Sequence, residues 1–452
     1  MPYQLYYDDT KTGAGLAKGI LEIPAVETSL DLSRVELHTK TGAELAHAFA
    51  KLHAGVTSID LGGNELSTIP GTELAEAFAG LQSTGVTTIS LRLNALGSKD
   101  PAELIEAFKA LPSHVTTINL SHNSLYRLFV NKRKTPLTEF FKSLAEVFKS
   151  LPAGITSLDL SSNFQNNALT FDQLRQLLKE LPTGLTSLNL SENKFHLKTR
   201  ADLVQAFAEL PAGITSLNLD ICSLGYTHHI DLAQIFTALP AGMTFLSLRN
   251  NILGSKSGAE LAQAFAGLHP SVTSLDLSDN DFDKKTDAEL DEALAALPIT
   301  VKSLVLNDKV INLDAFRSKL KEKILQRLEP QLLLIKDKAE NLKTRKYDEA
   351  YNAAQTLYLS LTNLKSQYSN GTIEYVAFKN DSIKEIKTAR VELEIHRGWK
   401  EILSNVLLCI LGLGIGYLAI CAYEGSFFKF NTDSAKKLDD LQNTIDPNAP
   451  TL

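Results

Sequence analysis

The chain has 452 residues, of which 44% are hydrophobic and 21% charged, so it can hold two or three domains and is neither disordered nor mostly embedded in a membrane. Its formal net charge of −7 does not fit a general nucleic-acid binder, which normally carries a basic face. The three cysteines, Cys222, Cys409 and Cys421, are too few for a disulfide framework. Met1 to Gly19 contain no apolar core, so a secretory signal peptide is not expected.

A repeated phrase, such as VTSIDLGGNEL from Val56, runs through the first 312 residues. One leucine marks its register, and successive leucines lie 29 or 30 residues apart except for one step of 40: Leu32, Leu61, Leu91, Leu120, Leu160, Leu190, Leu219, Leu248, Leu277 and Leu306. Such self-similarity at a fixed period is typical of solenoids. We therefore expect about ten stacked repeats.

Each repeat predicts a strand followed by a helix. Leu188-Asn189-Leu190 alternates with period two, which indicates a short strand with one buried face. An asparagine three residues after the marker leucine is suited to binding backbone groups where the chain turns. Leu261, Phe265 and Leu268 then lie on one face of a helix, and phrases such as Leu-Pro-x-Gly end it.

These residues resemble the leucine-rich repeats of the ribonuclease-inhibitor type, with the pattern L-x-x-L-x-L-x-x-N/C-x-L. The resemblance covers roughly residues 26–312, and Cys222 occupies the Asn/Cys place, which predicts a structural thiol. It implies an α/β solenoid with parallel strands on the concave side and helices on the convex side. We expect residues 1–25 to form an N-terminal cap, because terminal repeats are atypical: Val35 and Lys309 stand at the asparagine place.

The concave face of such a solenoid is the predicted protein-binding surface. Small polar and acidic residues line it, without the basic residues that track phosphates or the aromatic residues that stack on bases. Phe245 and Arg249 stand out, since both residue types are frequent at interface hot spots. The candidate residues are Asp60, Arg92, Asn119, Asp159, Asn189, Asn218, Phe245, Arg249 and Asp276.

The 40-residue step contains a basic and aromatic insertion, from Tyr126 to Leu137. Insertions in solenoids lie in loops on one face, so this one is either a tolerated loop or a second docking site. Its candidate residues are Arg127, Phe129, Lys132, Arg133 and Lys134.

The sequence contains no recognisable catalytic constellation, and we predict no enzyme activity, cofactor, metal or small-molecule substrate. Cys222 lies near His228 and His229, where solvated surface is the expected use of the histidines. Asp279, Asp281 and Asp283 suggest a calcium loop, but the required glycine is replaced by Lys284 and the terminal glutamate by Leu290.

The apolar period changes from Leu313 onward and predicts a helical bundle or hairpin over residues 313–401. The first helix is expected to be interrupted at Pro330, and the turn signal Tyr368-Ser369-Asn370-Gly371 separates a second helix from a third.

An uncharged run of 22 residues follows, from Ile402 to Tyr423. At ~1.5 Å per residue it would span about 33 Å, which matches the ~30 Å hydrocarbon core of a bilayer. Trp399 on one flank and Tyr423, Phe427 and Phe428 on the other are of the type found at membrane interfaces. We expect residues 402–423 to form a single transmembrane helix, with residues 424–452 as a tail. The alternatives for this run are a buried helix of the bundle and a re-entrant hairpin bent at Gly412, Gly414 and Gly416. Because lysine and arginine are more frequent on the amino side, the repeats should lie in the cytosol.

The stretch HRGWKEILSNVLLCILGLGIGYLA, followed by FFKFNTDSAKKLDDLQ, is similar to the carboxyl-terminal region of several Legionella effectors, and the LPAGITSLDLS repeats are similar to leucine-rich-repeat effectors of those bacteria. The resemblance implies delivery into a host cell by a type IV secretion system.

Together these features predict a non-enzymatic recognition protein, tethered to a lipid membrane, that binds a host protein through its concave face. One alternative is a regulator of a small GTPase, to which Arg92 or Arg249 would supply charge in the transition state. Another is a soluble scaffold whose apolar helix is buried in its own bundle.

Overall fold

The computed structural model describes residues 2–5, 11–130, 146–164, 171–195, 200–226 and 232–411. Two compact units divide the chain: the first comprises residues 1–252, 271–280 and 305–308, and the second comprises residues 253–270, 281–304 and 309–452. The predicted domain boundaries, after residues 25, 312, 401 and 423, stay predictions.

Short strands follow one another in a sheet whose order is the chain order, β1 to β12, and the neighbouring pairs from β1 to β10 are parallel. In register, Ile59 pairs with Ile89, and Ile89 pairs with Ile118. The strands are β1 (Tyr3–Gln4), β2 (Ser29–Asp31), β3 (Ser58–Asp60), β4 (Thr88–Ser90), β5 (Thr117–Asn119), β6 (Ser157–Asp159), β7 (Ser187–Asn189), β8 (Ser216–Asn218), β9 (Phe245–Ser247), β10 (Ser274–Asp276), β11 (Ser303–Leu306) and β12 (Lys309–Ile311). The ten predicted strands are β2 to β11, which confirms the repeat register.

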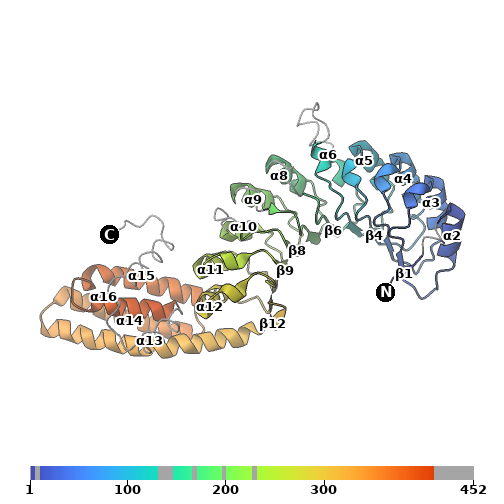
Figure 1. Ribbon diagram of the computed structural model, residues 1–452. Helices are drawn as coiled ribbons and strands as arrows, with labels where there is room; N and C mark the ends of the chain where they lie inside the picture. The colour runs from blue at the N-terminus through green and yellow to red at the C-terminus, as the bar shows by residue number, and fades with distance from the viewer. Residues whose placement is uncertain are drawn as a thin grey trace. The chain divides into compact units, whose positions relative to one another are not determined.

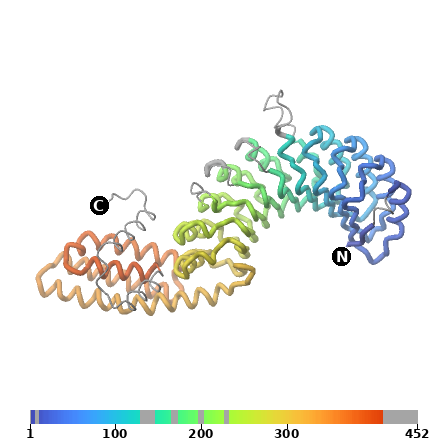
Figure 2. The backbone as a smooth tube through the Cα atoms, in the orientation of Figure 1, coloured from blue at the N-terminus to red at the C-terminus, as the bar shows by residue number. Residues whose placement is uncertain are grey.

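A helix follows most strands. In the first unit, helices lie along the outer side and strands along the inner side (Figure 1), and the backbone makes one coil per repeat (Figure 2). The helices of the repeats are α2 (Gly13–Leu21), α3 (Gly42–Phe49), α4 (Gly71–Ala79), α5 (Pro101–Lys109), α6 (Arg127–Val130), α8 (Phe171–Lys179), α9 (Arg200–Phe207), α10 (Leu232–Ala238), α11 (Gly258–Ala266) and α12 (Asp287–Ala295). Single 3-10 turns are η1 (Leu37–Thr39), η2 (Leu66–Thr68), η3 (Leu96–Ser98), η5 (Leu253–Ser255) and η6 (Phe282–Lys284).

The repeat core forms because the recurring spacing places one apolar face of each helix over the buried side of its strand. In the repeat of β3, the residues Val56, Ile59, Leu61, Leu66, Leu74 and Phe78 are all at most 2% exposed. The helix begins at a capping residue: in α3, the Thr41 hydroxyl accepts from the Glu44 N–H and the Glu44 carboxylate accepts from the Thr41 N–H.

The second unit contains α11 and α12 together with a bundle of longer helices, which lie lengthwise against one another (Figure 2). The bundle helices are α13 (Leu313–Thr344), α14 (Asp348–Asn370), α15 (Tyr375–Leu393) and α16 (Trp399–Ile410). The predicted interruption of the first helix is wrong, since α13 continues through Pro330. Pro330 lies on an exposed face of α13, where water can bind the carbonyl group that loses its partner.

The predicted membrane segment is also wrong. No helix among the residues that the structure describes is long and apolar enough to cross a membrane. The first part of the apolar run instead belongs to α16, which packs against α13 and α15. Ile402, Leu403, Val406 and Ile410 are at most 4% exposed in the bundle core. A helical apolar stripe that finds protein partners satisfies the hydrophobic effect as well as lipid would. The rest of the run, from residue 412, lies outside the described residues.

The predicted position of Trp399 at a membrane interface is corrected together with the membrane segment. Its side chain is 1% exposed and belongs to the bundle core, because α16 begins at this residue with its apolar face turned inward. Tyr423, Phe427 and Phe428 lie outside the described residues. The expected single-pass membrane localisation is therefore corrected, together with the cytosolic placement of the repeats that depended on it.

Candidate interaction surface

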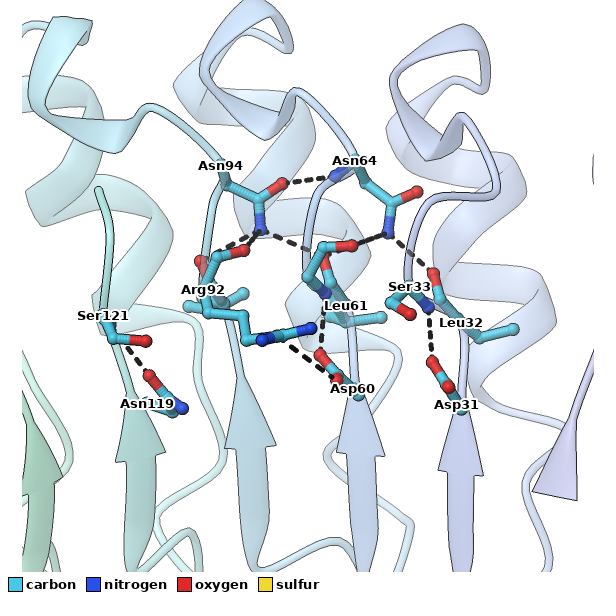
Figure 3. Close-up of polar contacts among 12 residues, drawn as sticks. Asp31, Leu32, Ser33, Asp60, Leu61, Asn64, Arg92, Asn94, Asn119 and Ser121 are labelled. Carbon is cyan, nitrogen blue, oxygen red and sulfur yellow. Dashed lines mark hydrogen bonds and ion pairs between the residues drawn. The ribbon is translucent and has the colours of Figure 1, made fainter. Parts of the chain in front are cut away.

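A ladder of buried asparagines holds the strands in place. The Nδ2 atom of Asn94 donates to the carbonyl oxygen of Leu61 at 2.9 Å, and Oδ1 accepts from the backbone N–H of Asn64 at 2.8 Å (Figure 3). Asn64 in turn donates to the carbonyl oxygen of Leu32 at 2.7 Å. Each side chain therefore satisfies backbone groups where the chain turns, as the sequence predicted, and it also links two successive repeats. The asparagines of this ladder are at most 1% exposed: Asn64, Asn94, Asn123, Asn163, Asn193, Asn251 and Asn280.

Cys222 continues this ladder in place of asparagine. Its Sγ atom lies 3.4 Å from the carbonyl oxygen of Leu190, and its backbone N–H donates to Oδ1 of Asn251 at 3.1 Å. Complete burial raises the pKa of the thiol to about 12. The thiolate is thus strongly disfavoured, and the residue is structural rather than nucleophilic.

The predicted concave residues lie on the inner side of the strands, and most of them also shape the turn that follows. Oδ1 of Asn119 accepts from the backbone N–H of Ser121 at 2.8 Å, and Oδ1 of Asp31 accepts in the same way from Ser33 (Figure 3). The same contact, at 2.8 to 3.0 Å, is made by Asp60, Asp159, Asn189, Asn218 and Asp276. One polar atom of each side chain accepts the hydrogen bond from the turn backbone, so each side chain keeps a second polar atom for another contact.

Arg92 lies beside Asp60, and its Nε atom is 3.9 Å from Oδ2 of Asp60 (Figure 3). Because both side chains are more than 30% exposed, solvent screens this pair and it contributes little to stability. Next to Arg92, Leu93 is 40% exposed and has a positive φ of 57°.

The surface changes at β8 and β9. Ser247 stands where most other repeats have Asp or Asn, so the usual side-chain oxygen that binds the turn is missing. An oxygen of Asp220, from the preceding repeat, takes its place. Oδ1 of Asp220 accepts from the Ser247 hydroxyl at 2.5 Å and from the Arg249 N–H at 2.8 Å. Burial raises the pKa of Asp220. Phe245 is partly buried on this face.

Arg249 extends toward the two following repeats. Its Nη2 atom lies 2.6 Å from Oδ2 of Asp279 and 3.3 Å from Oδ1 of Asp308. Phe245 and Arg249 do lie on the same side of the sheet, but the carboxylates around Arg249 were not predicted. The sequence does contain a signal for these carboxylates, because Asp279 and Asp308 each follow the marker leucine of their repeat by two residues and so occupy equivalent positions.

The remaining predicted site residues fall outside this surface. Arg127 begins α6 and is exposed. Phe129 lies within α6, whereas Lys132, Arg133 and Lys134 lie outside the described residues. Of the calcium-loop candidates, Asp279 binds Arg249 and Asp281 binds Lys284 at 3.1 Å. Within the described parts of the chain, no group of three or more His, Cys, Asp or Glu side chains could hold a metal ion.

A cavity of about 490 Å³ lies in the second unit, where the end of α12 meets α13 and the start of α15. Two of its charged lining residues make contacts with the protein: Arg317 donates to the carbonyl oxygen of Pro298 at 2.8 Å, and Nζ of Lys321 lies 5.5 Å from the ring centre of Tyr368. This cavity was not predicted from the sequence, because residues distant in the chain form it.

Comparison with known proteins supports the repeat architecture. A solved structure, the leucine-rich repeat-containing protein LegL7 from Legionella pneumophila, is similar to this chain with a TM-score of 0.58 and 29% sequence identity, over 70% of this chain and 96% of that one. The Rad7 and Elc1 complex in yeast matches at a TM-score of 0.39 and 14% identity, over 70% of this chain and 81% of that one, which is too low to support an inference. No family model matches the sequence. Nor does any curated protein match it significantly.

The solenoid of parallel strands and helices, its asparagine ladder and this likeness together define the class of protein. The chain is a leucine-rich repeat protein that resembles a leucine-rich repeat protein of Legionella. The leucine-rich-repeat fold indicates a protein-binding module.

Proposed function

We propose that this chain is a non-enzymatic recognition protein that binds a host protein through the inner face of its strands. One observation carries the proposal. Strands β2 to β10 hold the side chains of their inner face in register, and most of the predicted residues on them keep a polar atom beyond the one used in the turn. A regular row of hydrogen-bonding groups on a rigid scaffold can bind a polypeptide at low entropic cost.

The same proposal includes delivery into a host cell. Its support is the resemblance of the repeats, and of the carboxyl-terminal stretch from His396, to Legionella effectors. A fusion of the full chain to a reporter enzyme that is active only in host cytosol would test it: the signal should appear in infected cells and vanish in a strain without type IV secretion.

In the alternative, a GTPase regulator, Arg92 or Arg249 would supply charge to the transition state. To supply charge to a transition state, Arg249 would first have to leave the carboxylates of Asp279 and Asp308. The assay is GTP hydrolysis by a panel of small GTPases with and without the full chain.

Site-specific photocrosslinking can test recognition directly. A photoreactive amino acid replaces Asn189, on the inner face of β7, in the full chain. The matched control replaces Lys179, an exposed residue of α8. In host-cell extract we expect a discrete crosslinked protein from position 189 and none from position 179. Identical products from both positions, or none from position 189, would rule out binding through the inner face.

A further inference from the structure

The inner face is not uniform in charge. Near β2 to β4, the carboxylates of Asp31 and Asp60 are balanced by Arg34 and Arg92. Near β8 to β11, Arg249 faces four carboxylates: Asp220, Asp276, Asp279 and Asp308. We call these four carboxylates, at the carboxyl-terminal end of the inner face, the acidic patch.

The acidic patch already binds one guanidinium group. Nε of Arg249 lies 2.7 Å from Oδ2 of Asp279, and Nη2 contacts both Asp279 and Asp308. The side chains of Asp279 and Asp308 remain 43% and 63% exposed. Oδ1 of Asp276 accepts from the Ser278 N–H at 2.9 Å, which leaves its second oxygen for another donor. The patch can therefore accept further cationic donors beside Arg249.

An unpaired hydroxyl group and an exposed apolar side chain lie near the carboxylates. Ser278 is 1% exposed, and its hydroxyl has no hydrogen-bond partner among the described residues. Ile221 is 45% exposed, and its backbone N–H donates to the carbonyl oxygen of Arg249 at 2.9 Å, which places it next to the patch. Its φ of 54° is uncommon for a β-branched residue. The corresponding residues of the neighbouring repeats are polar, Glu192 and Asn250.

We propose that the acidic patch and Ile221 bind a basic segment of a protein partner, in which a lysine or arginine stands close to an apolar side chain. The basic group meets Asp276, Asp279 and Asp308, and the apolar group packs on Ile221. Charge complementarity favours such a partner and disfavours nucleic acids and acidic peptides. This inference rests on the proposed function and specifies the partner's chemistry.

A random 12-residue peptide display library, selected on the full chain, provides the test. We expect enriched peptides to carry Lys or Arg near Leu, Ile, Phe or Met, and their affinity to fall as salt rises. In fluorescence anisotropy, the double variant Asp279→Asn with Asp308→Asn should bind such peptides at least tenfold more weakly. Ile221→Ser should also weaken binding.

The matched control is Asp31→Asn with Asp159→Asn, which removes the same charge elsewhere on the inner face. Asparagine makes the same turn contact at Asn119, so these variants should keep the fold. Enrichment of acidic or uncharged peptides, no enrichment, or equal binding by the two double variants would overturn the inference. If a protein crosslinked from position 189 binds the Asp279→Asn, Asp308→Asn variant normally, the proposed function stands and only this inference fails.

Discussion

The backbone N–H of Gly42 donates to Oε2 of Glu73 in the next repeat at 3.0 Å. A Cβ atom at Gly42 would lie 2.4 Å from the carbonyl oxygen of Glu73, so only glycine allows the two helix starts to approach this closely. Gly71 and Glu103 repeat the relationship at 3.0 Å. A second ladder thus links the helices, in addition to the asparagine ladder that links the strands.

Gly42→Ala should therefore destabilise the protein. Because the nearest obstacle is backbone, the two repeats must move apart, and we expect a loss of about 1–3 kcal/mol in the free energy of unfolding. Urea denaturation followed by circular dichroism measures it. The control is Gly184→Ala, whose Cβ would meet its nearest atom at 3.4 Å. Equal stabilities of the two variants would argue against close approach at Gly42.

Asn94→Ala should be much more costly than Asn119→Ala. Loss of the Asn94 side chain leaves the N–H groups of Asn64 and Leu66 and the carbonyl group of Leu61 without this partner in the interior. Each buried unpaired group costs ~1–3 kcal/mol, so we expect a loss of about 3 kcal/mol or more. Asn119 makes one local contact at a partly buried site, and its loss should cost under about 1 kcal/mol. The same denaturation experiment compares both, and similar losses would contradict the ladder.

Cys222 should be inert in the folded protein. Burial raises the pKa of the Cys222 thiol to about 12, so almost no thiolate exists at pH 8. Iodoacetamide at pH 8 should leave Cys222 unmodified and should label it fully in guanidinium chloride, as peptide mass spectrometry would show. The control thiol is Ile221→Cys, at a neighbouring position that is 45% exposed in the wild type, and it should react readily. Rapid labelling of native Cys222 would mean that this repeat opens.

Lys379 and Glu292 form an ion pair at 2.6 Å in the second unit, and Glu292 is only 4% exposed. Lys379→Met leaves that carboxylate buried without its cation and should cost about 3–5 kcal/mol. The double variant Lys379→Met with Glu292→Leu removes both charges and should recover most of the loss. A thermal denaturation cycle of the four proteins measures the coupling. Additive losses would show that the two charges do not depend on each other.

Trp399 is the only tryptophan in the chain and is 1% exposed, so its fluorescence reports whether α16 packs in the bundle. Acrylamide should quench the native protein weakly and the unfolded protein strongly. The control places a tryptophan at Val391, which is 84% exposed, in a Trp399→Phe background, and should be quenched strongly in the native state. Strong native quenching of Trp399 would contradict the packing of α16.

Much of the solenoid could be predicted because the same local sequence pattern recurs from repeat to repeat. The marker leucines, the asparagine three residues later and the capping residues act within about 30 residues, and repetition distinguishes the pattern from chance. The inner-face positions of residues such as Asn119 and Phe245 follow from the same register. The Gly42–Glu73 contact also leaves a signal, the recurring G-x-E at helix starts, although its meaning appears only when two repeats are stacked.

Contacts between distant segments depended on the tertiary structure. Residues 402–410 have the hydropathy of a membrane segment, but their apolar face is buried by α13 and α15, and hydropathy alone does not distinguish protein from lipid as the apolar surrounding. The acidic residues around Arg249 come from different repeats and meet because the side chain of Arg249 extends across them. Local sequence determines backbone periodicity through propensity and hydrophobic alternation, whereas the direction of a long side chain depends on the charges that stacking brings within its reach.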